Sequence, residues 1–254
     1  MTPAPLVMIH GAFCGGWVFD AFAEPFRAAG HAVLTPDLPR HAPGAGTAAG
    51  LSMSDYAAAM AETAAGLDAP PVIVGHSLGG LVALLAASKV RTAGVILLAP
   101  SPPWGVSGST MEEAISAIGL YALGPYWTQA IDPDFGTFAR YGVDRLESAE
   151  RQAVFGRMQP ESGRALFETL NWWLDPFMTT LVHPGRINAP ILALAGERDV
   201  IHPPATVRET ARRVGAHMEV LAGMSHWLPA EPGWREAADL CLGWLEEAGA
   251  RSAA

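Results

Sequence analysis

The chain of 254 residues has little positive charge and few cysteines. Only 16 residues are Lys or Arg, against 25 Asp or Glu, so the formal net charge is −9. Such an acidic chain repels nucleic acid and anionic lipid surfaces, so we expect neither as a partner. The two cysteines, Cys14 and Cys241, are too few for a disulfide framework, and their spacing fits no metal site. We therefore expect two free thiols.

The sequence also lacks long hydrophobic runs. No run approaches the roughly 20 apolar residues of a membrane-spanning helix. The N-terminus has neither the basic region nor the apolar segment of a secretory signal. These absences favour a cytoplasmic protein with no membrane partner. No extended nucleotide or metal motif is present, so we expect no cofactor.

Short apolar runs alternate with helical patterns along most of the chain, half of which is hydrophobic. Apolar strands separated by helices are typical of a mostly parallel sheet with helices on both faces. The fold class is therefore α/β, with about six strands. We expect strands at 5–9, 31–36, 70–75, 94–100, 191–196 and 218–223, and helices at 17–29, 54–66, 81–89, 204–214 and 233–247.

The alternation stops at the sequence Ser101-Pro102-Pro103-Trp104. The following stretch of about 80 residues has helical patterning, prolines and bulky aromatics, but no clear strand. We interpret residues 103–187 as a helical cap inserted into an α/β core made of residues 1–102 and 188–254.

The sequence Gly75-His76-Ser77-Leu78-Gly79 stands between an expected strand and an expected helix. It matches the G-x-S-x-G nucleophile elbow, in which a tight turn lifts the serine hydroxyl above the edge of the sheet. The flanking glycines leave room for that turn. The alternative is a glycine-rich turn whose serine caps the helix. The strand before it and the helix after it favour the nucleophile.

A serine nucleophile needs a base and an acid that orients the base. Asp199 follows the expected strand 191–196, and His226 follows the expected strand 218–223. The order Ser, Asp, His is the one that this elbow predicts. We therefore expect Ser77 as nucleophile, His226 as base and Asp199 as orienting acid. Glu197 is the alternative acid, and Asp199 is favoured because it lies two residues further beyond the strand.

The oxyanion that forms during acyl transfer needs two N–H donors. One should be the amide of Leu78, directly after the nucleophile. The other should come from the loop HGAFCGGW at residues 10–17, where Ala12 is the favoured donor and Phe13 the alternative. Cys14 in this loop is expected to be a small buried hydrophobe rather than a reactive thiol.

The stretches HGAFCGGW, AAGHAVLTPDL and GHSLGG resemble the α/β-hydrolase superfamily, in the branch of plant methyl-ester hydrolases and hydroxynitrile lyases. The resemblance implies the α/β-hydrolase fold with a cap, no cofactor, and a site made of Ser77, Asp199, His226 and the amides of Ala12 and Leu78.

The same resemblance separates reactions within the superfamily. The lyases of this branch typically have a threonine beside the oxyanion loop and a nearby lysine, whereas this chain has Ala12 and a single lysine, Lys89. Epoxide hydrolases and haloalkane dehalogenases of the fold use an aspartate at the elbow, where this chain has Ser77. Both differences favour a hydrolase with a serine nucleophile.

We therefore expect a serine hydrolase of carboxylic esters with an apolar or aromatic pocket. A lactonase, C–C hydrolase, cofactor-free perhydrolase or hydroxynitrile lyase on the same triad is the alternative, and a non-enzymatic ligand receptor is disfavoured by the intact triad. The partner would be a small-molecule ester or lactone, and the protein a monomer or homodimer.

Two groups of residues in the expected cap could face the substrate. Gln159 and Glu161 either face the cleft or lie on the surface, and the surface is favoured. Four tryptophans either line the pocket or form the core of the cap: Trp104, Trp127, Trp172 and Trp173.

Overall fold

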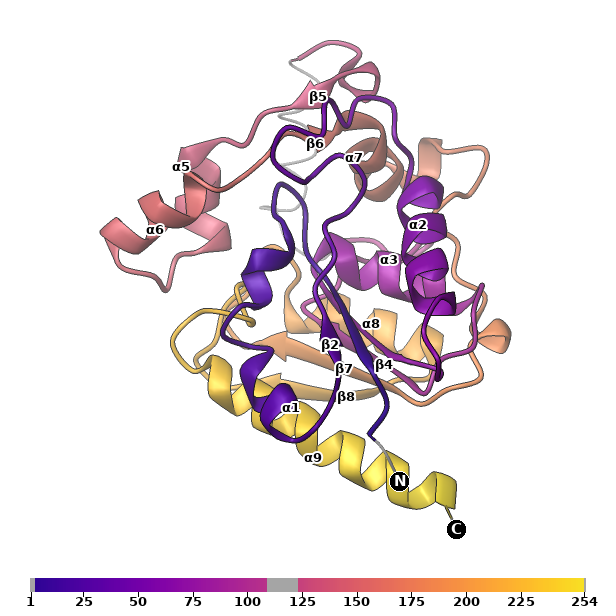
Figure 1. Ribbon diagram of the computed structural model, residues 1–254. Helices are drawn as coiled ribbons and strands as arrows, with labels where there is room; N and C mark the ends of the chain where they lie inside the picture. The colour runs from indigo at the N-terminus through magenta and orange to yellow at the C-terminus, as the bar shows by residue number, and fades with distance from the viewer. Residues whose placement is uncertain (1–2, 109–122, 254) are drawn as a thin grey trace.

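The computed structural model describes residues 3–108 and 123–253, and its centre is a six-stranded sheet in which all pairs are parallel. The strands lie in the order β2-β1-β3-β4-β7-β8 (Figure 1). The expected parallel sheet is therefore confirmed. Its strands are β1 (Leu6–Ile9), β2 (Val33–Leu34), β3 (Val72–His76), β4 (Gly94–Leu98), β7 (Ile191–Gly196) and β8 (His217–Leu221).

Helices follow the strands near the expected positions, and α8 (Pro204–Val214) has the expected bounds. The expected helix 17–29 is divided into a 3-10 turn, η1 (Gly16–Phe19), and a short helix, α1 (Glu24–Ala28), because Pro25 is tolerated only in a first helical turn. Helix α2 (Met53–Ala65) begins one residue before the expected start, and Ser52 caps it. The last helix, α9 (Trp234–Ala253), extends beyond the expected end at residue 247, through the alanine-rich end of the chain.

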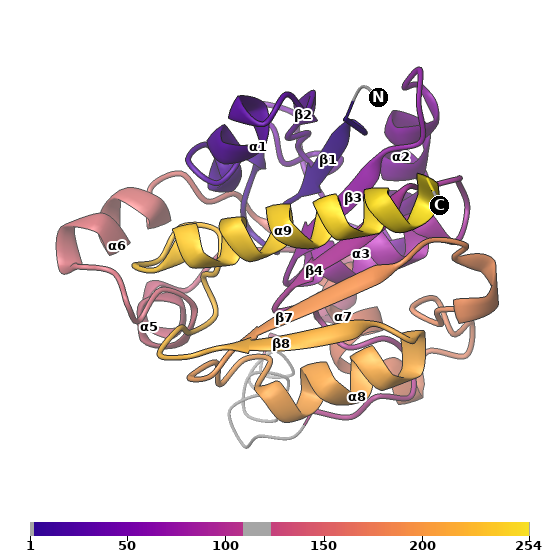
Figure 2. The same ribbon diagram turned by 90° about the horizontal axis from the view of Figure 1, so that it is seen from below.

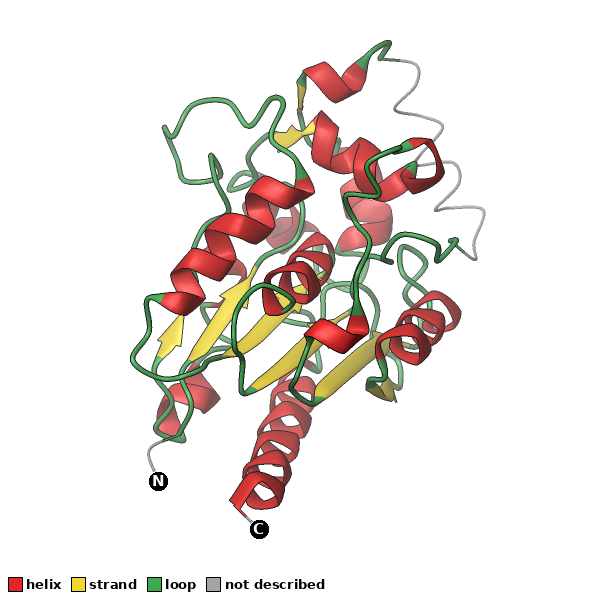
Figure 3. Ribbon diagram, turned by 90° about the vertical axis from the view of Figure 1, so that its right-hand side faces the viewer, coloured by secondary structure: helices red, strands yellow, loops and turns green. Residues whose placement is uncertain are grey.

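The helices cover both faces of the sheet. Figure 2 shows α9 crossing one face, on which α1 also lies. Helices α2 and α3 pack on the opposite face, which Figure 3 shows covered by helices. Alternate strand residues serve the two faces: Val7 and Ile9 pack with α3 (Leu78–Ala87), whereas Leu6 and Met8 pack with Phe22 near α1. This two-faced burial explains why the strands are almost continuously apolar.

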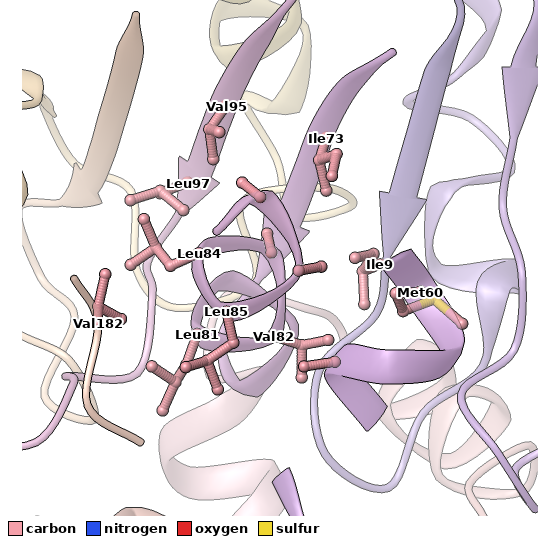
Figure 4. Packing of buried hydrophobic residues seen from close by; sticks show 14 of the residues in the cluster. Ile9, Met60, Ile73, Leu81, Val82, Leu84, Leu85, Val95, Leu97 and Val182 are labelled. Carbon is pink, nitrogen blue, oxygen red and sulfur yellow. The ribbon is translucent and has the colours of Figure 1, made fainter. Parts of the chain in front are cut away.

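Helix α3 is buried along its whole length. Figure 4 shows Leu84 of this helix beside Leu97 of β4, and both belong to one buried cluster with Leu81 and Val95. Burying an aliphatic side chain of this size stabilises the fold by roughly 1.5–3 kcal/mol. Because Ser77 directly precedes α3, this packing fixes the position of the serine.

Most of the described part of the segment between β4 and β7 lies beyond the carboxyl ends of the strands (Figure 1). The sequence predicted no strand here, but β5 (Ala130–Ile131) and β6 (Glu161–Ser162) form a short antiparallel pair. Two-residue strands are too short to show an alternating pattern, which explains the omission. The other described elements of this segment are η2 (Tyr126–Thr128), α5 (Phe135–Thr137), η3 (Phe138–Gly142), α6 (Ser148–Phe155), α7 (Gly163–Leu170), η4 (Trp172–Leu174) and η5 (Pro184–Arg186).

The strand order places a crevice at the site. The chain passes from β1 to β2 on one side and then crosses to β3 on the other side of β1. At such a switch point, the loops after the two neighbouring strands diverge and leave room for a ligand. The loop after β1 is HGAFCGGW, and the residue after β3 is Ser77. Within the part of the chain that is described, no helix combines the length and apolar character needed to cross a bilayer.

Candidate active site

Ser77 occupies a strained turn between β3 and α3, with φ 53° and ψ −123°. This conformation is unfavourable for a residue with a side chain, and it is often found at functional sites. A Cβ atom on Gly75 would lie 2.2 Å from the carbonyl oxygen of Gly79, and one on Gly79 would lie 2.3 Å from that of His10. Both positions of the elbow therefore require glycine, because neighbouring backbone carbonyls leave no room for a side chain.

The hydroxyl of Ser77 faces a histidine rather than capping the helix. Its side chain makes no capping hydrogen bond, which the alternative interpretation of this motif required. Instead, Ser77 Oγ lies 3.0 Å from Nε2 of His226, in the loop after β8. Nδ1 of the same ring lies 2.8 Å from Oδ2 of Asp199, in the loop after β7. The structure thus brings together the three side chains predicted from separate strand ends.

The carboxylate of Asp199 is held in place on both oxygens. Its Oδ1 accepts hydrogen bonds from the backbone N–H groups of Ile201 (2.8 Å) and His202 (2.9 Å). Burial by itself would raise the pKa of Asp199, but the facing His226 and the other hydrogen bonds hold this pKa below its usual value. Asp199 is therefore ionised and accepts the proton on Nδ1, which leaves Nε2 free to accept from the serine.

Glu197, the alternative acid, lies elsewhere. It is exposed, and its carboxylate accepts the backbone N–H of Gly223 at 2.8 Å. Only Asp199 of the two acids contacts His226. The two extra residues beyond the strand allow Asp199 to turn inward.

His76 supports the backbone of His226. Its Nε2 donates to the carbonyl oxygen of His226 at 2.8 Å, and the two ring centroids are 5.0 Å apart. Burial, together with the neighbouring His226, lowers the pKa of His76 to about 3. His76 is therefore neutral and acts as a hydrogen-bond donor behind the site.

The loop after β1 passes directly over the serine. A Cβ atom on Gly11 would lie 3.0 Å from Cβ of Ser77. Among the described residues, the amides of Ala12 and Leu78 have no protein acceptor. The amide of Phe13, by contrast, donates to Oε2 of Glu161 at 3.3 Å. The first two amides are therefore available to a ligand, and the third is engaged.

A cavity of about 540 Å³ opens beside Ser77 and His226. Its described walls are mainly apolar, including Phe138, Met158 and Leu166 from the segment between β4 and β7. Cys14 also lines it, and burial raises the pKa of this thiol, so the side chain is a neutral hydrophobe. The polar wall residues outside the triad include Asp132, Asp134 and Thr137.

The four tryptophans considered for the pocket are not among the described residues that line it. Trp104 packs against Trp172 with ring centroids 5.1 Å apart, and Trp173 is 58% exposed. Trp127 packs on Tyr126 and Phe167. Among the described wall residues, the one tryptophan is Trp227, directly after His226. Composition indicated an aromatic-rich segment, but only the packing shows which aromatic rings face the cavity.

Glu161 is buried, which corrects the expectation that it lies on the surface. Its carboxylate contacts His41 and Tyr56 as well as Phe13. Gln159 is half-buried, and its backbone N–H donates to the carbonyl oxygen of Phe13 at 2.8 Å. Sequence analysis missed His41 and Tyr56 because neither belongs to a motif and both contact Glu161 only through the fold.

Within the part of the chain that the structure describes, no group of three His, Cys, Asp or Glu side chains is arranged to hold a metal ion. The site as described therefore consists of a serine, a histidine, an aspartate and two open amides beside an apolar cavity.

Known proteins share both the sequence pattern and the fold. The model of the alpha/beta hydrolase family matches residues 6–239. A pimeloyl-[acyl-carrier protein] methyl ester esterase of Neisseria meningitidis is 29% identical over 231 residues, covering 86% of this chain and 84% of that protein. A pyrethroid hydrolase of Sphingobium wenxiniae is 36% identical over 81 residues, and this match spans only 29% of that protein and 32% of this chain.

Solved structures show the same fold. An extracellular alpha/beta-hydrolase from a Paenibacillus species, whose description notes homology to tobacco salicylic acid binding protein 2, superposes with a TM-score of 0.72 at 21% identity, covering 95% of this chain and 98% of that chain. A methylesterase from Arabidopsis superposes with a TM-score of 0.67 at 16% identity, covering 94% of this chain and 98% of that one. The resemblance to the α/β-hydrolase superfamily is confirmed, and the likeness to plant methyl-ester hydrolases is confirmed in the fold.

Proposed function

The chain belongs to the alpha/beta hydrolase family, and on that premise we propose that it hydrolyses carboxylic esters through an acyl-enzyme on Ser77. The observation that carries the proposal is the hydrogen-bonded series from Ser77 through His226 to Asp199 at the wall of an apolar cavity. The names of the relatives, an esterase and a hydrolase, support the same reaction class.

The geometry supports a two-step acyl transfer. In the first step, Ser77 Oγ attacks the ester carbonyl while Nε2 of His226 takes its proton. The C–O bond to the alcohol then breaks, and His226 returns the proton to the leaving alcohol. In the second step, His226 takes a proton from water, whose oxygen attacks the acyl-enzyme. Collapse of the second intermediate releases the acid and restores the Ser77 hydroxyl.

Two backbone amides are placed to stabilise the intermediates. As the carbonyl oxygen becomes negative, it can accept from the N–H groups of Ala12 and Leu78, which have no other acceptor among the described residues. One donor of this kind contributes about 10²- to 10³-fold to kcat in a serine protease. Asp199 adds to this by stabilising the imidazolium that forms on His226.

The segment from residue 103 to residue 187 serves, in this proposal, as a cap that shapes the acyl or alcohol pocket. It contributes Phe138, Met158 and Leu166 to the cavity wall. No Lys or Arg is among the described wall residues, and the sequence of residues 109–122 contains neither. Asp132 and Asp134 add negative charge at the wall. The pocket therefore favours an uncharged, apolar ester over one with a free carboxylate.

A lyase or a lactonase on the same triad is the alternative chemistry. Ala12 carries no hydroxyl, and Lys89 follows the far end of α3 and is not among the described wall residues, so neither polar group typical of the lyases stands at the site. Lactones differ from open-chain esters only in shape, so they belong in the substrate panel.

The test is acid release in a pH-stat. The panel contains methyl esters of alkanoic and aromatic acids, γ- to macro-lactones, and monomethyl esters of dicarboxylic acids matched in length to the alkanoates. We expect turnover of neutral esters, with kcat/KM at least 10-fold higher than for the matched half-esters. Ser77→Ala should abolish it. Undiminished turnover by folded Ser77→Ala protein would refute the acyl-enzyme.

A further inference from the structure

A buried carboxylate joins the segment between β4 and β7 to the loop over the serine. Glu161, at the start of β6, is fully buried. Its Oε2 accepts from the Phe13 amide at 3.3 Å and from Nε2 of His41 at 3.0 Å. Its Oε1 accepts from the Tyr56 hydroxyl at 2.6 Å and from the Ser162 amide at 2.7 Å. Both oxygens are thus fully used, which fixes the carboxylate in one orientation.

His41 is the positive partner of this carboxylate. Its Nε2 faces Glu161, and its Nδ1 lies 3.1 Å from the carbonyl oxygen of Pro39. Carboxylate and carbonyl oxygens only accept hydrogen bonds, so both ring nitrogens carry a proton and the ring is an imidazolium. Burial opposes this charge, but Glu161 raises the pKa of His41 overall. Removing one member of a buried ion pair is costly, so the pair holds the segment and the loop after β2 together.

Phe13 is held in an unfavourable backbone conformation. A turn closed by the Cys14 amide and the Gly11 carbonyl puts Phe13 at φ 64°, a region that favours glycine. The segment between β4 and β7 forms hydrogen bonds with both the N–H and the C=O of Phe13. Glu161 accepts its N–H, and the Gln159 amide donates to its C=O at 2.8 Å.

The orientation of Phe13 decides which amide is open. With its N–H directed to Glu161, Phe13 cannot donate to an oxyanion at Ser77. The preceding amide, that of Ala12, is left without a protein acceptor among the described residues. Without the carboxylate, the strained turn would be free to relax, and the Ala12 peptide would turn with it.

We propose that Glu161 is a positioning residue for the oxyanion hole. From the segment between β4 and β7, its carboxylate accepts the N–H of Phe13, and this contact directs the Ala12 amide toward the reacting carbonyl. This inference rests on the proposed esterase function. Glu161 acts through Phe13 and does not touch the substrate. The same contacts make the cap and the oxyanion hole a single structural unit.

The test is Glu161→Gln, which keeps the shape of the side chain. Four donors surround the carboxylate, so in either orientation the Gln NH2 group faces N–H or O–H donors. We expect kcat for the preferred ester to fall 10- to 100-fold and KM to change less than threefold. The Ki of a trifluoromethyl ketone, which forms a tetrahedral oxyanion adduct with the serine, should rise in proportion to the loss in kcat/KM.

Glu168→Gln is the matched control. Glu168 of α7 is also a buried carboxylate of this segment, and it accepts the Met53 amide of α2 at 2.8 Å without touching the loop. Its kcat should stay within threefold of wild type. Equal losses in both variants, or an unchanged Ki in Glu161→Gln, would show a merely structural role and overturn the proposal.

Two further variants complete the test. If Glu161→Gln does not fold, Glu161→Asp replaces it, because Asp keeps the charge beside His41 but its carboxylate is one methylene further from Phe13. The same fall in kcat and rise in Ki are expected, and wild-type values would overturn the proposal. Ser77→Ala distinguishes failure of the proposed esterase function from failure of the proposed role of Glu161. If the Ser77→Ala variant retains turnover, the proposed function fails. If it is inactive while Glu161→Gln matches wild type, only the role of Glu161 fails.

Discussion

The carboxylate of Asp199 lies 2.8 Å from Nδ1 of His226. Asp199→Asn replaces an acceptor with an amide that can donate to Nδ1, which favours the imidazole tautomer with its proton on Nε2. That tautomer cannot accept a proton from Ser77. We expect kcat to fall by about 10⁴-fold, the loss seen for the same change in a serine protease, with little change in KM. Steady-state kinetics at pH 7–8 on the preferred ester measure this.

Glu197→Gln is the control for this prediction. Its carboxylate is exposed and contacts the Gly223 backbone, so an amide oxygen can replace it. Its kcat should stay within twofold of wild type. Similar losses in the two variants would contradict the assignment of Asp199 as the orienting acid.

Gly79→Ala should damage the elbow. The added Cβ would lie 2.3 Å from the carbonyl oxygens of both His10 and Ile9, so β1 and α3 must move apart. Overpacking of this kind costs about 3 kcal/mol, which lowers the Tm of a chain of this size by about 6–12 °C. Activity should fall more than 10-fold, because the Leu78 amide moves with α3. Thermal unfolding and kinetics of the purified variant test both effects.

Gly243→Ala is the opposite case among the glycines. Gly243 lies within α9, and a Cβ there meets no atom within 4 Å. Replacing this helical glycine should stabilise the protein by about 0.5–1 kcal/mol and leave activity unchanged. A Gly79→Ala protein as stable as Gly243→Ala would show that the elbow tolerates a side chain.

Stability should fall in mild acid because of buried neutral histidines. Burial, together with the nearby His41, lowers the pKa of His10 from 6.5 to about 4. Between these pH values the unfolded chain binds this proton and the folded protein does not, so the free energy of unfolding decreases as the pH falls. From pH 7 to pH 5, His10 alone should account for about 1–2 kcal/mol.

His10→Gln isolates this contribution. The amide oxygen of Gln can accept the Leu38 N–H that Nε2 of His10 accepts at 2.8 Å. Urea unfolding at pH 7 and pH 5 should show a smaller loss of stability for the variant than for wild type. Identical losses would mean that His10 is not the group that takes up the proton on unfolding.

Glu231 should have the opposite pH dependence. It is buried and accepts the Ser225 amide at 2.7 Å, next to His226. Burial, with Asp144 nearby, raises the pKa of Glu231 from 4.5 to about 7. Its stabilising contribution is full below pH 4.5 and is lost as the pH rises through 7, because the unfolded chain ionises first.

Glu231→Gln should therefore stabilise the protein at high pH. The amide oxygen of Gln still accepts from Ser225, and the variant never has to ionise. At pH 8 its Tm should exceed that of wild type by about 2–6 °C, and at pH 4.5 the two should agree. A lower Tm of the variant at pH 8 would show that the ionised carboxylate is needed there.

Local pattern determined much of the fold and where the site should be sought. Apolar runs and their flanking residues identified the strands, and the sterics of a tight turn explain the glycines around Ser77. Parallel strands end at a common edge, so the loops that carry Ser77, Asp199 and His226 were expected to meet. Each of these inferences depends on neighbours in the sequence or on strand direction, and both can be inferred from a single sequence.

Only the tertiary structure decided the surroundings of the site. Glu161 contacts Phe13, Tyr56 and His41 across 148, 105 and 120 residues of sequence. A carboxylate in a loop is assigned to the surface by default, and its burial depends on partners that no local pattern places beside it. The same reason applies to the cavity wall. Among the described residues Trp227, in the loop after β8, lines it and Trp173 does not, because packing between distant elements sets the direction of each side chain.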